Sequence, residues 1–164
     1  MLRTNKMTKA RAGKGTFAIV ASEYNSQYVN AMVKAAKGEL SQAGARQVQV
    51  FRVPGAFEIP VIAARLARGS EYAIRDTQYA AIICLGVSLR GETVHAAYIG
   101  EAVTRALMDI QVRYEVPVIH EVLLLENEQQ ARVRCLSKKH NRGAEAAQTA
   151  LAMARLMAKM RPEQ

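Results

Sequence analysis

The run Thr16-Phe17-Ala18-Ile19-Val20-Ala21-Ser22 decides the fold class, because this short apolar segment is followed directly by a segment with helical periodicity. The run has the length of a strand and contains Ile and Val, which predicts a buried β-strand. Apolar residues then recur at helical spacing, and Gly44 suits the end of that helix. The recurring positions are Val29, Met32, Val33, Ala36 and Leu40.

The alternation of strand and helix continues to the end of the chain. Further strands are predicted over residues 48–53, 79–85 and 118–125. Helices are predicted over 59–66, 99–110, 127–136 and 143–160, with Asn127 as a candidate N-cap and 68–78 as a polar loop. Repeated strand–helix units indicate a parallel sheet covered by helices on both faces. The predicted fold class is therefore α/β with a four-stranded parallel sheet.

The composition is typical of one folded domain. The chain has 164 residues, of which 50% are hydrophobic, and no apolar run approaches the roughly 20 residues that cross a bilayer. The N-terminal segment lacks the apolar core of a secretory signal, so we expect a soluble, cytoplasmic protein. A four-stranded sheet leaves edges that Ala-rich helices cover poorly, so we also expect an oligomer.

The net charge of +9 is concentrated at the N-terminus, where five basic residues fall within the first 14. We interpret residues 1–14 as a basic, flexible extension and residues 15–160 as the domain. The extension is either a solvated tail, an arm for nucleic acid or another polyanion, or a transit peptide. It contains no aromatic residue for base stacking, which favours the solvated tail.

Three predicted strands end in segments rich in functional side chains, namely residues 22–25, 53–58 and 86–95. In open α/β sheets, ligands bind outside the carboxyl ends of the strands. The ring of Tyr24 or Phe57 can stack on a planar heterocycle, or it can simply seal the end of the sheet. The carboxylate of Glu58 can accept hydrogen bonds from ligand hydroxyls, or it can be a first-turn helix residue.

The third of these segments combines an anion site with a proton carrier. Gly91-Glu92-Thr93 leads into a helix start, where free N–H groups and the helix dipole favour phosphate. His95 is the residue there whose side chain type exchanges protons near neutral pH. The structural alternatives are that Thr93 is only an N-cap and that His95 has no chemical role.

Several common functional classes lack their motifs in this sequence. There is no Gly-x-Gly-x-x-Gly, no phosphate-binding Gly-Lys-Ser/Thr and no Gly-x-Ser-x-Gly. Cys84 and Cys135 are too isolated to suggest metal-ligand spacing, so no metal is expected.

Two motifs resemble those of the lumazine synthase family. Residues 53–60, VPGAFEIP, are similar to the family's Val-Pro-Gly-Ala-Phe/Tyr-Glu-Ile-Pro, and residues 85–95, LGVSLRGETVH, resemble its Leu-Gly-x-x-Ile-Arg-Gly-Glu-Thr-x-His. Weaker similarities lie at residues 22–25, 117–119 and 128–143. The segments occur in the family's order and spacing from about Phe17 to Met157.

The resemblance implies a three-layer flavodoxin-like sandwich and an enzyme, a transferase of riboflavin biosynthesis. Its substrates are 5-amino-6-(D-ribitylamino)uracil and 3,4-dihydroxy-2-butanone 4-phosphate, and its product is 6,7-dimethyl-8-ribityllumazine. No cofactor is implied. The implied assembly is a homopentamer, in some members a 60-subunit shell, whose active sites are shared between adjacent subunits. Riboflavin synthase is a candidate partner, whereas a membrane or a nucleic acid is not expected.

The resemblance also implies a role for individual residues, with His95 as the catalytic proton carrier. The residues matching the uracil side are Tyr24, Ala56, Phe57, Glu58, Val87, Ser88, Leu89 and His120. The residues matching the sugar phosphate side are Glu92, Thr93 and Arg134. In the family, the positions of His120 and Arg134 belong to the neighbouring subunit.

The sequence departs from the family pattern at a few positions. Tyr24 replaces a Phe, Ala96 an aromatic residue, and Arg142 a Lys. His120-Glu121 stands where Phe-Gly is usual, which puts the second apolar wall of the uracil pocket in doubt. That departure is the support for an alternative function, a non-catalytic carrier of flavin or lumazine on the same fold.

Overall fold

A computed structural model describes residues 15–69, 78–91 and 94–160 of the chain. Its centre is a four-stranded sheet of β1 (Thr16–Ser22), β2 (Gln47–Val53), β3 (Tyr79–Leu89) and β4 (Val118–Leu125). The strand order is β2-β1-β3-β4, and each neighbouring pair is parallel. The predicted four-stranded parallel sheet is confirmed.

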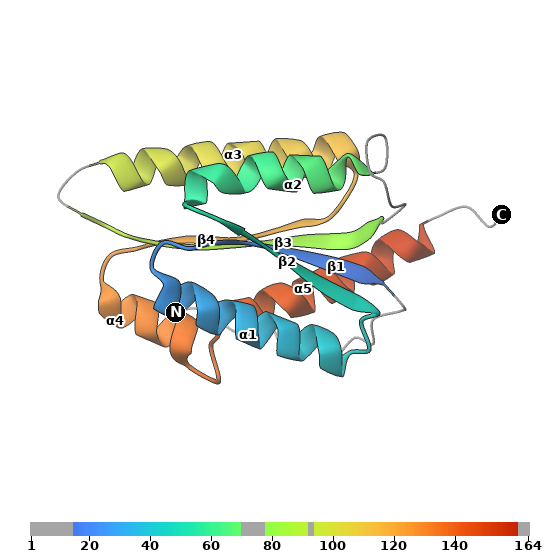
Figure 1. The fold of residues 1–164 in the computed structure, drawn as a ribbon, viewed down its shortest axis with the longest axis horizontal. Coiled ribbons are helices and arrows are strands. Elements are labelled where there is room, and N and C mark those ends of the chain that lie inside the picture. Colours follow the sequence, from blue (N-terminus) through green and yellow to red (C-terminus); the bar gives the residue numbers. More distant parts are fainter. Residues whose placement is uncertain (1–14, 70–77, 92–93, 161–164) are drawn as a thin grey trace.

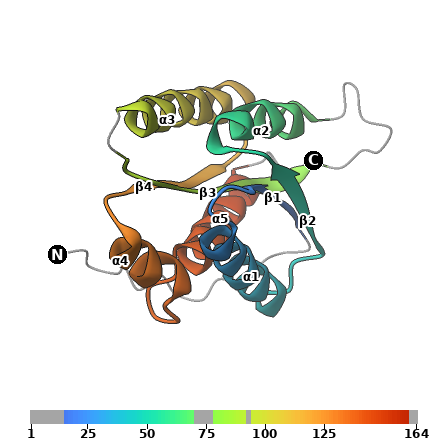
Figure 2. The same ribbon diagram turned by 60° about the vertical axis from the view of Figure 1, so that its left-hand side comes forward.

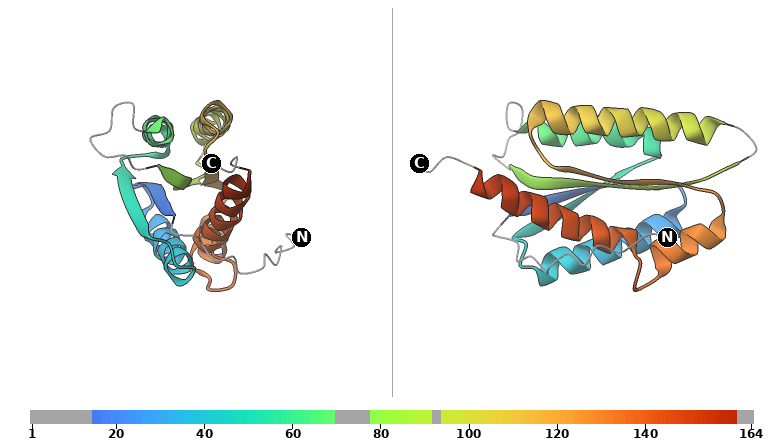
Figure 3. Two further views of the ribbon diagram at one scale, coloured as in Figure 1. Left: turned by 90° about the vertical axis from the view of Figure 1, so that its right-hand side faces the viewer. Right: turned by 180° about the vertical axis from the view of Figure 1, so that it is seen from behind.

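Helices cover both faces of the sheet and make a three-layer, flavodoxin-like sandwich (Figure 1). One face carries α2 (Ile59–Ala67), which follows the short helical turn η1 (Ala56–Glu58), and α3 (His95–Tyr114). The other face carries α1 (Ser26–Gln42), α4 (Glu128–Ala131), the adjoining turn η3 (Arg132–Leu136) and α5 (Arg142–Lys159). Figure 2 and the left view of Figure 3 show the sheet between the two helix layers.

Alternating residues of the strands build a separate core on each face. On β1, Phe17, Ile19 and Ala21 pack toward the α1/α5 layer, whereas Ala18 and Val20 pack toward α2 and α3. Each of these five side chains is at most 1% exposed. The continuous apolar run that predicted a buried strand therefore reflects a strand covered on both sides.

Two elements are longer than their sequence patterns predicted. The expected loop at residues 86–89 is the end of β3, because the backbone there pairs with β4 from Gly86↔Val122 to Leu89↔Leu125. A Cβ on Gly86 would lie 3.0 Å from a methyl group of Val122, so the small residue suits this close strand contact. Helix α3 begins at His95 rather than at Ile99. The sequence pattern missed the first turn because that turn is exposed and has no apolar stripe.

Asparagine caps and a glycine set the approach of the helices on the α1/α5 face. The Asn141 side chain accepts hydrogen bonds from the N–H groups of Gly143 and Ala144 and thereby caps α5. A Cβ on Gly143 would lie 2.0 Å from the carbonyl oxygen of Met32, so only glycine permits α5 to meet α1 here. The right view of Figure 3 shows these two helices against the sheet. Asn127 caps α4 as predicted, at 3.0 Å from the Gln130 N–H.

Among the described residues, no helix has both the length and the apolar character to cross a membrane.

Candidate active site

Hydrogen bonds tie together the loops that follow the first three strands. The backbone N–H of Glu23 donates to the carbonyl of Val53 at 2.8 Å, which joins the ends of β1 and β2. The side-chain amide of Asn25 donates to the carbonyl of Val87 at 2.8 Å, which joins the β1 loop to β3. Asn25 adopts a left-handed backbone, with φ of 53°, a conformation that Asn tolerates better than most residues. The rim is thus a connected platform and not a set of independent loops.

The same rim extends to β4. The N–H of Arg90 donates to the carbonyl of Leu125 at 2.8 Å, and the Arg90 side chain lies 3.4 Å from the Glu126 carboxylate. That ion pair is exposed, so it contributes little stability. It lies at the start of the segment that leads to His95.

The predicted stacking rings stand out from this rim. Tyr24 is 71% exposed and Phe57 is 63% exposed. A ring that sealed the end of the sheet would be buried, so this exposure favours contact with a ligand or with another chain. Ala56 lies beside Phe57 in η1 and is half-buried.

Glu58 closes the turn in which it lies. Its Oε2 atom accepts a hydrogen bond from the Gly55 N–H at 2.9 Å. The carboxylate is exposed, and its other oxygen is available to a ligand hydroxyl. The two interpretations of Glu58, as a turn residue and as a ligand contact, are therefore compatible.

The end of β3 presents mainly its backbone to the rim. Val87 is 1% exposed and its side chain belongs to the core on the α1/α5 face. Ser88 and Leu89 are half-buried. That this segment meets a ligand through its main chain stays a prediction.

His95 is the first residue of α3, directly after Val94, and its side chain is exposed. Within residues 15–69, 78–91 and 94–160, no side chain hydrogen-bonds to its ring. The predicted phosphate contacts Glu92 and Thr93 lie outside the described residues.

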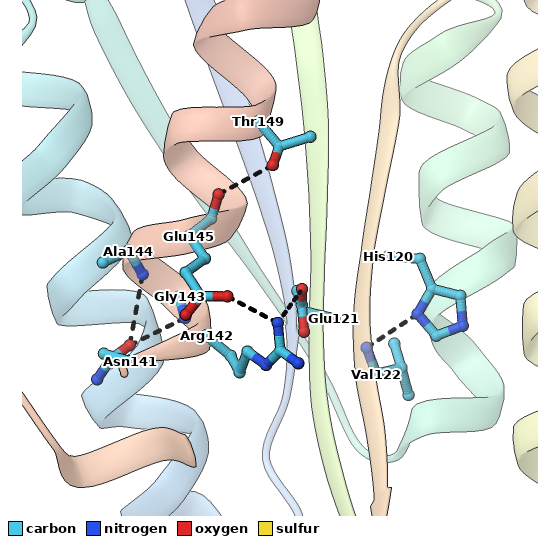
Figure 4. Close-up of polar contacts among 9 residues, drawn as sticks. All are labelled: His120, Glu121, Val122, Asn141, Arg142, Gly143, Ala144, Glu145 and Thr149. Carbon is cyan, nitrogen blue, oxygen red and sulfur yellow. Dashed lines mark hydrogen bonds and ion pairs between the residues drawn. The ribbon is translucent and has the colours of Figure 1, made fainter. Parts of the chain in front are cut away.

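His120 and Glu121 project from opposite faces of β4 (Figure 4). The His120 ring points to the α3 face, where its Nε2 atom lies 2.7 Å from Oγ1 of Thr104. Burial lowers the pKa of His120 from its ordinary value, although a hydrogen bond with the backbone of His120 itself raises it in part.

Glu121 belongs to a charged cluster on the α5 face that the sequence pattern did not reveal. Arg142 lies 2.7 Å from the carboxylate of Glu145 and 4.0 Å from that of Glu121 (Figure 4). Burial raises the pKa of Glu121 to about 7, because the loose contact with Arg142 only partly compensates for lost hydration. Glu121 is 21 positions before Arg142 and 24 before Glu145 in sequence, so only the fold brings it to the other two residues.

Arg134 lies in η3, on the same side of the sheet as this cluster. It is half-buried, and its charge lowers the pKa of both Glu121 and Cys135, although burial raises both pKa values overall. No carboxylate of the described residues forms an ion pair with it. The sheet separates Arg134 from the His120 ring, so one chain does not bring these two predicted site residues together.

The arrangement offers an aromatic and carboxylate rim, the exposed imidazole of His95, and the Arg134 guanidinium group, which forms no ion pair in the described part of the chain. No three His, Cys, Asp or Glu side chains of the described residues are placed to hold a metal ion together.

Comparison with known proteins identifies the family. A profile described as 6,7-dimethyl-8-ribityllumazine synthase matches residues 14–158. A protein of that name from Xanthomonas campestris pv. campestris (strain B100) is 37% identical over 143 residues, which cover 86% of this chain and 88% of the relative. Another of that name, from Stenotrophomonas maltophilia (strain R551-3), is 36% identical over the same coverage. The chain therefore belongs to the 6,7-dimethyl-8-ribityllumazine synthase family.

Proposed function

We infer that this protein is a lumazine synthase, a transferase of riboflavin biosynthesis. It condenses 5-amino-6-(D-ribitylamino)uracil with 3,4-dihydroxy-2-butanone 4-phosphate and forms 6,7-dimethyl-8-ribityllumazine, phosphate and water. The observation that carries this inference is the family match, which spans residues 14–158 and so includes every proposed site residue.

The chemistry needs proton transfers and a place for a departing phosphate. The 5-amino group attacks the ketone carbon, and loss of water gives an imine. Loss of a proton from C3 and of phosphate from C4 leaves an enol, which tautomerises to a methyl ketone. The ribitylamino nitrogen then attacks this carbonyl, and loss of a second water closes the ring.

The rim residues have the chemical character that the uracil substrate requires. Tyr24 stacks on the pyrimidine, and Glu58, with Ala56 and Phe57, holds the ribityl chain. Val87, Ser88 and Leu89 meet the pyrimidine through their backbone, and His120 forms its outer wall. His95 moves protons between the intermediates. Its side chain at the start of α3 is exposed and so accessible to a substrate.

Arg134 binds the phosphate and stabilises its departing charge, together with Glu92 and Thr93. Support comes from the absence of an ion pair to Arg134 within the described residues. Arg142 is already engaged by two carboxylates.

The proposed assembly is a pentamer, with 60-subunit shells as a further possibility, in which Arg134 and His120 complete the site of an adjacent subunit. Support comes from α3, which exposes large apolar side chains suited to a subunit interface. They are Tyr98, Met108 and Val112, at 66%, 58% and 69% exposure.

We further propose a cytoplasmic location, residues 1–14 as a basic extension to the domain at 15–160, and riboflavin synthase as a partner that uses the product.

One assay tests the function directly. The purified full-length chain is mixed with both substrates, and lumazine fluorescence and released phosphate are followed together. Equal amounts of both products are expected. Binding of riboflavin or lumazine without any turnover would instead identify the alternative, a carrier. Size-exclusion chromatography with light scattering measures the assembly, and a monomer would contradict the shared site.

A further inference from the structure

Both ring nitrogens of His120 are engaged within the chain. Nδ1 accepts a hydrogen bond from the backbone N–H of Val122 at 3.1 Å, as Figure 4 shows. An amide nitrogen can only donate, so Nδ1 carries no proton. A neutral imidazole that lacks the Nδ1 proton carries its proton on Nε2. The backbone of β4 thus selects one tautomer of His120.

Thr104 on α3 completes this assignment. Its Oγ1 atom lies 2.7 Å from the carbonyl oxygen of Gly100, which can only accept a hydrogen bond. The one hydroxyl proton of Thr104 therefore goes to Gly100, and Oγ1 accepts the Nε2–H of His120 at 2.7 Å. Each donor in the series Val122, His120 and Thr104 has an acceptor. A protonated ring would direct an Nδ1–H at the Val122 N–H and break the series.

The charged residue next to His120 in sequence, Glu121, lies across the sheet. Glu121 points to the α5 face, where it meets Arg142 (Figure 4). The imidazole instead lies on the α3 face, where its strand neighbour Val118 is buried in the core and Val122 packs against that core. Burial lowers the pKa of His120 and so favours the neutral ring, although a hydrogen bond with the His120 backbone raises it in part.

We propose that Thr104 is a positioning residue for the uracil substrate: with the Val122 amide, it holds His120 as a neutral Nε2–H ring whose nitrogens are both occupied. His120 then presents an aromatic surface to the pyrimidine and does not hydrogen-bond to it. This inference rests on the proposed place of His120 in the uracil site. It also removes the doubt about the pocket wall, because a neutral ring with satisfied nitrogens offers the kind of surface that a Phe offers.

The tautomer is tested without reference to catalysis. Magic-angle-spinning ¹⁵N NMR of sedimented, histidine-labelled protein at pH 7.5 distinguishes a protonated from an unprotonated ring nitrogen in any oligomeric state. The chain has three His residues, and His120→Phe identifies the signals that belong to His120. We expect a protonated Nε2 and an unprotonated Nδ1. An Nδ1–H tautomer or an imidazolium would overturn the proposal.

The positioning role is tested with two Thr104 variants. Thr104→Val keeps the shape but removes the acceptor, so the KM for the uracil should rise about three- to tenfold while kcat and the KM for the sugar phosphate change less than about twofold. Thr104→Ser keeps the hydroxyl and should restore the wild-type KM. An unchanged uracil KM in Thr104→Val would overturn the role, and Thr104→Ala replaces this variant if it does not fold.

A double variant separates positioning from general packing. In a His120→Phe background the ring no longer needs an acceptor, so adding Thr104→Val should leave the uracil KM unchanged. A further rise there would show that Thr104 acts through packing alone. A rise of more than about tenfold in His120→Phe itself would mean that a ring nitrogen binds the uracil, against the proposal. If the protein does not turn over, the dissociation constant of the uracil replaces KM in these comparisons. A failure of the proposed function can then be told apart from a failure of the proposed role of Thr104.

Discussion

The side-chain amide of Asn25 donates a hydrogen bond to the backbone carbonyl of Val87, across 62 positions of sequence and at 2.8 Å. It connects the loop that carries Tyr24 to the strand end proposed to meet the pyrimidine. This contact therefore fixes the position of the β1 loop relative to the end of β3, the two segments proposed to bind the uracil.

Replacing Asn25 with Asp tests this connection. The shape and the tolerance of a left-handed backbone are retained, but a carboxylate cannot donate to the Val87 carbonyl. We expect a loss of about 1–3 kcal/mol in the free energy of unfolding, from thermal melts at fixed protein concentration. The KM for the uracil should rise. The control Asn30→Asp, an exposed change within α1, should alter neither the stability nor this KM. A melt identical to wild type would show that the contact is unimportant in solution.

Replacing His95 with Ala should lower kcat by about 100-fold or less, because general acid–base catalysis commonly contributes in this range. The reaction also gains from holding two substrates together, which the variant retains. Steady-state lumazine fluorescence measures the effect, with His140→Ala in the exposed basic loop as the control. A loss of many orders of magnitude would contradict this balance between proton transfer and positioning.

Replacing Arg134 with Ala should raise the KM for the sugar phosphate about tenfold or more, since hydrogen bonds to a charged group are worth about 1.5–3 kcal/mol. The dissociation constant of the uracil should change little. Arg132→Ala is a matched control, because Arg132 lies two residues away and forms an exposed ion pair with Glu128 at 3.5 Å. Equal effects of the two changes would remove Arg134 from the phosphate site.

Mixing inactive chains tests whether the site is shared. His95→Ala and Arg134→Ala chains are denatured and refolded together. If His95 and Arg134 of adjacent subunits form one site, about a quarter of the sites in a random ring contain both residues intact. Activity should therefore exceed the sum of the two variants refolded separately. A purely additive result would place both residues of a site in one chain.

Replacing Glu121 with Gln should change how stability depends on pH. The pKa of Glu121 is raised in the fold from 4.5 to about 7. The neutral Glu121 side chain therefore stabilises the fold fully below pH 4.5. This contribution to the free energy of unfolding is lost as the pH rises through 7, where the buried group must ionise. Above that range the variant should be more stable than wild type, by at most a few kcal/mol. Below pH 4.5 the two melts should coincide, and a less stable variant at pH 8 would mean that the contact with Arg142 outweighs burial.

The succession of strands and helices could be predicted from periodicity, because a strand buried on both faces and an amphipathic helix leave different patterns of apolar residues. The rim positions of Tyr24, Phe57 and Glu58 followed from the rule that parallel strands end on one side of the sheet. Neither inference needs knowledge of distant contacts. The extension of β3 through Leu89 escaped prediction, since it depends on a partner strand that lies more than 30 positions later.

By itself, the sequence determined the α/β class, the rim segments and, through its motifs, the family. Local patterns suffice for these because they report which faces are apolar and where chain turns occur. Only the tertiary structure decided that Asn25 meets Val87, that Arg142 lies between Glu121 and Glu145, and that Thr104 faces His120. Such contacts depend on strand register and on which helix packs over which strand. No local pattern encodes them, because they arise only when distant segments are packed together.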